Sequence, residues 1–304
     1  MSLGGREFAL RSGPYDAVVT EVGGGLRVLR HDGRDVVRSY AADRVRPRYS
    51  GVVLAPWPNR VADGAYEFDG ESHQLPLSEP ERGNALHGLA VWDRFAVVDR
   101  SEASVTLLDR LVPRVGYPFE VEVAVTYTLD EKQGLRTTVR GTNTGSRPAP
   151  WGTAAHPYLR AGTDHVDDCD LVVPASQVLA VTPDRLLPRG LVPVEQPGLD
   201  FRTARRIGDT FLDHAFSGLE PGHDGLARVR LTSAAGTGVE CSWDPRVLPW
   251  VQVHTADTPE PENDRTGLAV EPMTCAPDAF NSGQDLVVLP PGGDHVAWWS
   301  LAAL

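Results

Sequence analysis

One histidine lies between a run of small residues and a proline. His156 lies in "WGTAAHPYLR", after four small residues and directly ahead of Pro157, whose ring fixes the backbone dihedral that follows. An imidazole with an ordinary pKa of about 6.5 can donate or accept a proton near neutral pH. The segment is typical of a strand that ends at a cavity, and other groups that reach the cavity would decide its chemistry.

Glu271 is a candidate general base. It ends the apolar run of "GLAVEPMTCAPDAFN" and is followed by Pro272. One interpretation places its carboxylate at a strand end that faces water, and the other half-buries it in a pocket. Half-burial would raise the pKa of this carboxyl from about 4.3 towards neutrality, where a general base works best.

Two further segments carry polar residues that a plain β-sandwich does not need. Asn59 and Arg60 follow two prolines in "APWPNRVADGAYEFDG", so a rigid backbone would aim the Arg60 guanidinium and its fork of N–H donors at hydroxyl oxygens. An arginine in a surface turn fits the same pattern. His87 lies among apolar residues in "RGNALHGLAVWDRF", where a lone histidine, like His156, is more often structural than reactive.

Asp213 and His254 are weaker candidates. Asp213 in "TFLDHAF" fits a solvated turn, and His254 in "WVQVHTA" has no obvious partner in the sequence. The "GGG" at 23–25 lacks the third, spaced glycine and the following helix of a dinucleotide site, and no P-loop, GxSxG or HExxH sequence occurs. Three cysteines without CxxC spacing disfavour a disulfide framework or a zinc site. We therefore expect no metal and no cofactor.

The elements that position these residues are predicted to be strands. Residues 119–129 alternate apolar and polar side chains with period two, residues 130–134 form a hairpin turn, and residues 135–141 form the returning strand. Helical periodicity is weak, and its best short candidate is 200–216. Further strands are expected at 17–20, 26–31, 96–99, 105–109, 170–173, 227–232, 238–243, 250–254, 268–271 and 296–301. Neither a boundary nor a repeat interrupts the pattern, so we predict an all-β fold, one large antiparallel sandwich domain over residues 1–304.

Composition limits the partners. The 304 residues carry a net charge of -12, which disfavours nucleic acid and anionic membranes because both need basic patches. No apolar run approaches the ~18 residues that a membrane-spanning helix needs. The opening "MSLGGREFAL" lacks the pattern of a secretory signal, and its first few residues are typical of an expression scar. We expect a cytoplasmic protein, a monomer or homodimer.

Four blocks in this order resemble the aldose 1-epimerase (galactose mutarotase) family, in its bacterial mutarotase-like branch. They are "APWPNRVADGAYEFDG", "NALHGL", "AAHPYL" and "VEPMTCAPDAFN", with weaker support from "DFRTARRIGDTFLDHAF" and "LPPGGDHVAWWS". The resemblance covers most of the chain. Leu159 stands where the family often has Phe, and the block around Asp213 aligns less securely. Both departures bear on substrate preference more than on the reaction.

The resemblance implies a β-supersandwich fold and the interconversion of α and β anomers of a free hexose. It assigns His156 as the acid that protonates the ring oxygen and Glu271 as the base that takes the O1 proton, on opposite sides of one sugar. It assigns His87 to the catalytic set as a group that binds and polarises the sugar. The residues that it assigns to substrate binding are Arg60, Asn59, Asp213 and Tyr158.

Three other functions remain open from the sequence. A hexose 6-phosphate epimerase would need a basic cluster, for which Arg202, Arg205 and Arg206 are the dense candidates, although they fit a solvated face. A carbohydrate-binding module would keep the pocket without turnover. A glycosidase would need a second acid, and only Asp213 is comparably placed.

Overall fold

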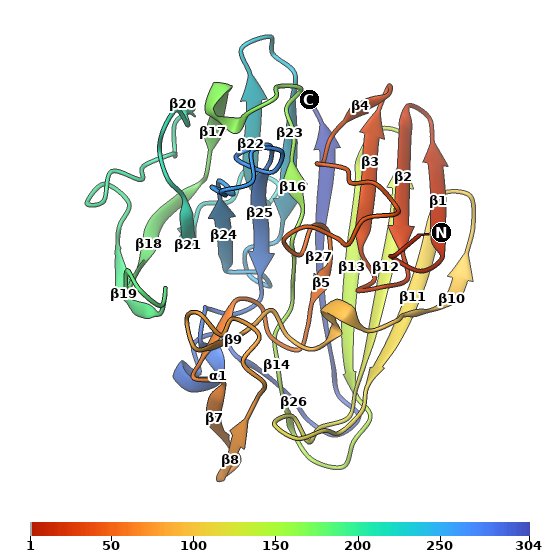
Figure 1. Ribbon diagram of the computed structural model, residues 1–304, viewed down its shortest axis with the longest axis vertical. Coiled ribbons are helices and arrows are strands. Elements are labelled where there is room, and N and C mark those ends of the chain that lie inside the picture. Colours follow the sequence, from red (N-terminus) through yellow and green to blue (C-terminus); the bar gives the residue numbers. More distant parts are fainter. Residues whose placement is uncertain (1) are drawn as a thin grey trace.

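Antiparallel strands build most of the computed structural model, which describes residues 2–304 (Figure 1). The largest sheet has nine strands and contains the predicted hairpin. Its strands, in spatial order, are β10 (Ala96–Arg100), β11 (Ser104–Leu111), β12 (Val121–Asp130), β13 (Gly134–Asn143), β27 (Asp294–Ala303), β23 (Gly238–Trp243), β22 (Ala227–Ser233), β17 (Cys169–Val172) and β20 (Arg205–Arg206).

The period-two alternation of β12 decides which of its faces is buried. Val121, Val123 and Val125 are fully buried, and the residues between them are partly exposed. The Asp130 carboxylate closes the turn into β13 by accepting hydrogen bonds from two backbone N–H groups that follow it. Gly134 has φ +78°, and a Cβ there would lie 2.2 Å from a carbonyl oxygen of β27, so the turn requires glycine.

An eight-stranded sheet carries the candidate site. Its strands are β19 (Pro188–Pro193), β18 (Ala175–Val181), β21 (Asp213–Leu219), β24 (Trp250–His254), β25 (Leu268–Met273), β15 (Ala154–Ala155) and β5 (Val53–Leu54), with β16 (Tyr158–Leu159) paired to β25. All six residues of β25 are buried. The register sets Gln252 opposite Glu271 and Asp213 opposite His254, so polar residues from neighbouring strands meet in adjacent rows.

Smaller sheets complete the fold. The four-stranded sheet of β1 (Glu7–Ser12), β2 (Tyr15–Thr20), β3 (Leu26–His31) and β4 (Arg34–Asp35) contacts β11 and β12 through β1 and β2 (Figure 1). Three pairs remain: β6 (Arg60–Ala62) with β9 (Asn84–Leu86), β7 (Ala65–Phe68) with β8 (Glu71–Gln74), and β14 (Ala149–Trp151) with β26 (Val287–Leu289). One buried cluster joins the sheets: it includes Phe8 of β1, Val123 of β12, Leu231 of β22 and Val253 of β24.

Helices are few and short between residues 2 and 304: α1 (Ala279–Ser282) and the 3₁₀ turns η1 (Ala90–Trp92) and η2 (Val166–Asp168). None of these helices has the length and apolar character needed to cross a bilayer. The predicted all-β class and the ten further strands expected from the sequence are confirmed, whereas the helical candidate at 200–216 is wrong. That segment forms β20 and the start of β21, because Asp213–Phe216 pair with β24 and tertiary pairing overrides a weak local periodicity.

Candidate active site

A cavity of about 660 Å³ opens at the eight-stranded sheet and is lined in part by residues of β21, β24 and β25. It brings together all the residues that the sequence proposed for the site, although they lie far apart along the chain. They are Asn59, Arg60, His87, His156, Tyr158, Asp213 and Glu271, and His254 joins them.

His156 sits in the break between β15 and β16, where the backbone is fixed on both sides. Its N–H donates to the Val52 carbonyl at 3.1 Å, and its own carbonyl accepts the Gly51 N–H at 2.7 Å. The carbonyl of Pro157 then accepts the Val270 N–H at 3.2 Å. The imidazole Nε2 lies 3.4 Å from the Glu271 Oε1, and both side chains are buried.

Glu271 is more deeply buried than either sequence interpretation supposed. It is 2% exposed and lies inside β25, which continues through Pro272 to Met273 instead of ending at the carboxylate. Burial raises its pKa well above the ordinary value, and the Asp213 carboxylate raises it further, while Arg60 opposes the shift. Burial and the nearby His254 lower the pKa of His156 to about 3. Both shifts favour the uncharged forms, a protonated Glu271 carboxyl and a neutral His156 imidazole.

Both members of the pair have an unused polar atom. Within residues 2–304, neither Glu271 Oε2 nor His156 Nδ1 has a hydrogen-bond partner, and the same holds for His87 Nδ1. A buried polar group without a partner costs about 1–3 kcal/mol. A ligand that carries several hydroxyl groups could supply the missing partners.

A strained backbone presents His87 to the cavity. The residue follows β9 with φ +64°, in the left-handed region, and its N–H donates to the Asn59 carbonyl at 2.8 Å. A Cβ on Gly88 would lie 2.1 Å from the Ala55 carbonyl oxygen, so only glycine fits after His87. The His87 ring meets the His156 ring edge-on, with centroids 5.1 Å apart. Burial and the neighbouring His156 hold the pKa of His87 well below its ordinary value, so this imidazole is neutral.

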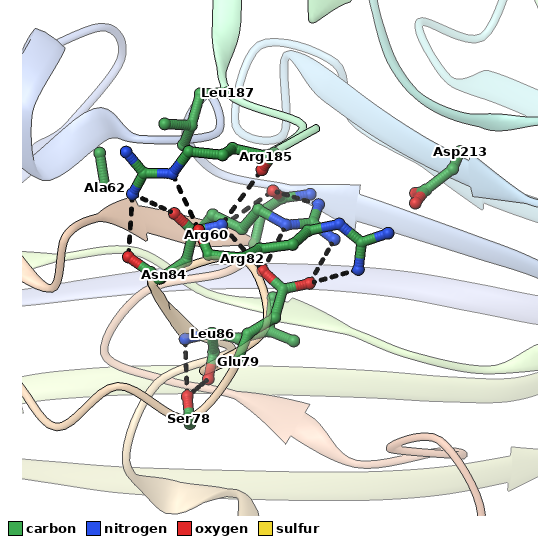
Figure 2. A network of polar contacts seen from close by, with 12 residues as sticks. Arg60, Ala62, Ser78, Glu79, Arg82, Asn84, Leu86, Arg185, Leu187 and Asp213 are labelled. Carbon is green, nitrogen blue, oxygen red and sulfur yellow. Dashed lines mark hydrogen bonds and ion pairs between the residues drawn. The ribbon is translucent and has the colours of Figure 1, made fainter. Parts of the chain in front are cut away.

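Arg60 is held by a carboxylate that the sequence did not suggest. Glu79 accepts from Arg60 Nε at 2.9 Å and from Arg60 Nη2 at 3.0 Å, and both side chains are nearly inaccessible (Figure 2). Arg82 and Asn84 donate to the same carboxylate. Asn59 adds its side-chain oxygen, which accepts the Arg60 backbone N–H at 3.0 Å. The guanidinium is therefore fixed in direction, as the prolines predicted, but through an ion pair.

A second polar chain crosses the floor of the cavity. The Gln252 carboxamide donates to Asp213 at 2.6 Å and accepts from the Asn59 side chain at 3.3 Å. Asp213 is thus tied to the site and is not the solvated turn residue that its sequence context suggests. Gln252 was missed, since a glutamine inside the strand "WVQVHTA" carries no motif; its position opposite Glu271 comes only from strand register.

Tyr158 and Tyr49 form aromatic walls on the histidine side. The Tyr158 ring stacks on the His156 ring with centroids 5.1 Å apart, and its hydroxyl donates to the Arg48 carbonyl at 3.2 Å. Tyr49 meets the His87 ring at 4.7 Å. Sequence reasoning missed Tyr49, which lies in a turn segment without a recognisable pattern.

Other predicted features lie away from the cavity. Arg202 pairs with Glu195 and Asp200, and Arg206 pairs with Asp170, so these arginines form the solvated face that their spacing suggested. The glycines 23–25 make the turn between β2 and β3, and no helix follows them. In the described part of the chain, no group of three or more His, Cys, Asp or Glu side chains is arranged to hold a metal ion.

Known proteins share both the sequence pattern and the fold. The family model described as aldose 1-epimerase matches residues 6–302. The chain belongs to the aldose 1-epimerase family. It is 35% identical over 301 residues to the uncharacterized protein YihR of Escherichia coli, covering 99% of this chain and 94% of that one. It is 26% identical over 330 residues to the galactose mutarotase of Rattus norvegicus, covering 97% and 94%.

A solved structure supports the fold at lower identity. The GalM/aldose epimerase homologue from C. elegans superposes with a TM-score of 0.85 at 18% identity, covering 98% of this chain and 99% of that chain. The predicted galactose mutarotase-like β-supersandwich is therefore confirmed.

Proposed function

We propose that this protein is an aldose 1-epimerase that interconverts the α and β anomers of a free hexose. The observation that carries the proposal is the buried pair of His156 and Glu271, with a nitrogen and an oxygen 3.4 Å apart in a polar cavity. Membership of the family supports an epimerase, and the residues of this cavity supply the proposed roles.

The chemistry needs two proton transfers and no redox step. Glu271 takes the proton from O1, His156 gives one to the ring oxygen, and the C1–O5 bond breaks to leave an aldehyde. After rotation about C1–C2, the two groups reverse these transfers while the ring closes on the other face. Each positioned acid or base of this kind is worth about 10²–10⁴-fold in rate.

The relative position of the proposed acid and base differs from what the sequence suggested. The acid and base were expected on opposite sides of the sugar, whereas their side chains lie next to each other in the cavity. O1 and the ring oxygen are both bonded to C1, and two C–O bonds of about 1.4 Å at a near-tetrahedral angle place them about 2.3 Å apart. A pair that stands on one side of C1 can therefore reach both oxygens.

The protonation that burial favours matches the open-chain stage of this scheme. Once the ring has opened, Glu271 carries the proton and His156 is neutral, which is the arrangement that burial favours. The reactive start has the proton on His156 instead, as an imidazolium beside a Glu271 carboxylate, and hydroxyl groups of the bound sugar would have to stabilise that ion pair. Arg60, Asn59 and Asp213 supply polar atoms for the sugar, and His87 supplies a neutral imidazole that can polarise it.

Polarimetry on freshly dissolved α-glucose and α-galactose tests the proposal. We expect His156→Ala and Glu271→Gln each to lower anomer exchange by about 10²–10⁴-fold with the fold intact. The exposed residue Glu67 offers a matched control, since Glu67→Gln should leave the rate unchanged. Near-full activity in either site variant would refute the assignment.

Two arginines at the cavity favour testing the alternative substrate, a hexose 6-phosphate. Arg48 and Arg82 line the cavity, although each lies near a carboxylate, Glu260 at 3.6 Å and Glu79 at 3.2 Å. Comparing exchange rates for glucose and glucose 6-phosphate separates the two substrates. Two-dimensional exchange NMR on an equilibrated sugar separates turnover from binding alone, the third possibility.

A further inference from the structure

Four arginines are buried in the part of the chain that the structure describes, and they divide into two kinds. Arg60 pairs with Glu79, and Arg265 pairs with Asp167 and Asp257. Arg38 and Arg46 are 8% and 7% exposed, and within residues 2–304 their hydrogen bonds go to uncharged oxygens and not to a carboxylate. A buried guanidinium without a counter-ion projects positive potential into its surroundings.

Arg38 lies behind Tyr158, which in turn packs on His156. Its guanidinium is 4.3 Å from the Tyr158 ring centroid, and the Tyr158 ring stacks on the His156 ring at 5.1 Å. The guanidinium donates only to neutral oxygens: Ser50 Oγ at 3.0 Å and, at 3.3 Å each, the Asn263 carbonyl and the Thr266 hydroxyl. None of these acceptors carries a charge that would neutralise Arg38 next to the candidate acid.

Arg46 approaches His87 in a similar way, through two aromatic rings. Its guanidinium lies 4.3 Å from the Trp92 ring centroid, Trp92 faces Tyr49 at 6.4 Å, and Tyr49 meets His87 at 4.7 Å. Its side chain donates to two backbone carbonyls, those of Val22 and Val91. Each candidate histidine is thus reached from a buried, unpaired arginine through aromatic rings.

We propose that Arg38 and Arg46 are positioning residues of the proton-transfer site, and that their unneutralised charges act across these aromatic rings to keep the His156 imidazole neutral. This inference rests on the proposed function. It gives a role to two arginines that are buried without carboxylate partners in a protein whose net charge is -12. The lowered pKa of His156, to which both arginines contribute after burial and His254, agrees with it.

Other charged and titratable groups also face His156 and must be held constant in a test. Glu271 contacts it from β25, and His254 faces it from β24. His87 and Tyr49 pack on it from the opposite wall. Arg48 and Arg160 lie near Arg38 and lower the pKa of that guanidinium after burial does, although each also lies within 4.0 Å of a carboxylate.

The test is the pH profile of kcat/KM for anomer exchange in Arg38→Met, which removes the charge and keeps most of the volume. The stack places the guanidinium within about 10 Å of the imidazole, so at an effective dielectric constant of about 20 its loss should raise the pKa of the pair by about one pH unit. We expect the whole profile to move by that amount towards alkaline pH. Arg38→Lys should keep the original profile, as should Arg11→Met, which removes an exposed arginine.

A lower rate with an unmoved profile in Arg38→Met would show a purely structural role and would overturn the proposal. If that variant does not fold, Arg38→Gln carries the same expectation and Arg46→Met a smaller shift in the same direction, since Arg46 reaches the site through two rings. An unmoved profile in both overturns the proposal equally. If the wild type binds sugar without exchanging anomers, the proposed function fails. The pH dependence of galactose binding, measured by calorimetry, then tests the arginines independently.

Discussion

Replacing Glu79 with glutamine tests whether Arg60 depends on a buried carboxylate for its position. The side chains of Glu79 and Arg60 are 5% and 10% exposed, and two charged hydrogen bonds join them. Glu79→Gln keeps the shape of the side chain but leaves the Arg60 charge buried without its partner. Breaking a buried ion pair in this way costs about 3–5 kcal/mol.

That cost should be visible in both stability and catalysis. In a chain of this length, 1 kcal/mol shifts Tm by about 2 °C, so Glu79→Gln should melt about 6–10 °C lower at pH 7. Arg60 would also lose the contact that aims it, and we expect KM for the sugar to rise about tenfold while kcat changes less. Differential scanning calorimetry and progress curves by polarimetry measure the two effects.

The stability that the Glu79–Arg60 ion pair contributes should depend on pH. Burial alone would raise the pKa of Glu79, but the hydrogen bonds and charge of Arg60 lower it below its ordinary value. A carboxyl whose folded pKa is depressed stabilises the fold above its unfolded pKa of about 4.3, and that contribution is lost as pH falls through the folded value. The stability difference between wild type and Glu79→Gln should therefore shrink below about pH 4. Equal melting temperatures at pH 7, with Glu67→Gln as the control, would refute the reasoning.

Sequence patterns alone predicted the scaffold better than the site. Strands 26–31, 238–243 and 250–254 have the same bounds in the structure, because alternating side chains and turn residues at their ends act locally. The roles of His156 and Glu271 came instead from the order of four blocks. Each block alone was also compatible with a structural residue.

The site residues that could not be recognised from the sequence are positioned by contacts with segments far away along the chain. Glu79 lies in "SEPERGN", where two glutamates and an arginine are equally plausible surface residues. Only the folded chain buries Glu79 beside Arg60 and leaves Glu81 at the rim of the cavity. Gln252 and Tyr49 follow the same rule, since strand register and a turn bring them to the site. The depth of Glu271 also depends on the strands beside β25, which are β24 on one side and β15 and β16 on the other.

Two further substitutions probe how the backbone and the cavity floor support the site. Gly88→Ala would place a Cβ 2.1 Å from the Ala55 carbonyl oxygen at φ +80°, so we expect loss of His87 positioning, a lower Tm and at least a tenfold fall in kcat/KM, measured by calorimetry and polarimetry. Gln252→Met removes the hydrogen bonds to Asp213 and Asn59 while keeping the length of the side chain. Because a hydrogen bond to a charged group is worth about 1.5–3 kcal/mol, KM should rise about tenfold or more, with kcat within about threefold of wild type. If kcat fell instead and KM stayed constant, Gln252 would act on the reacting atoms and not on sugar binding, and the assignment of Asp213 as a binding group through this contact would be wrong.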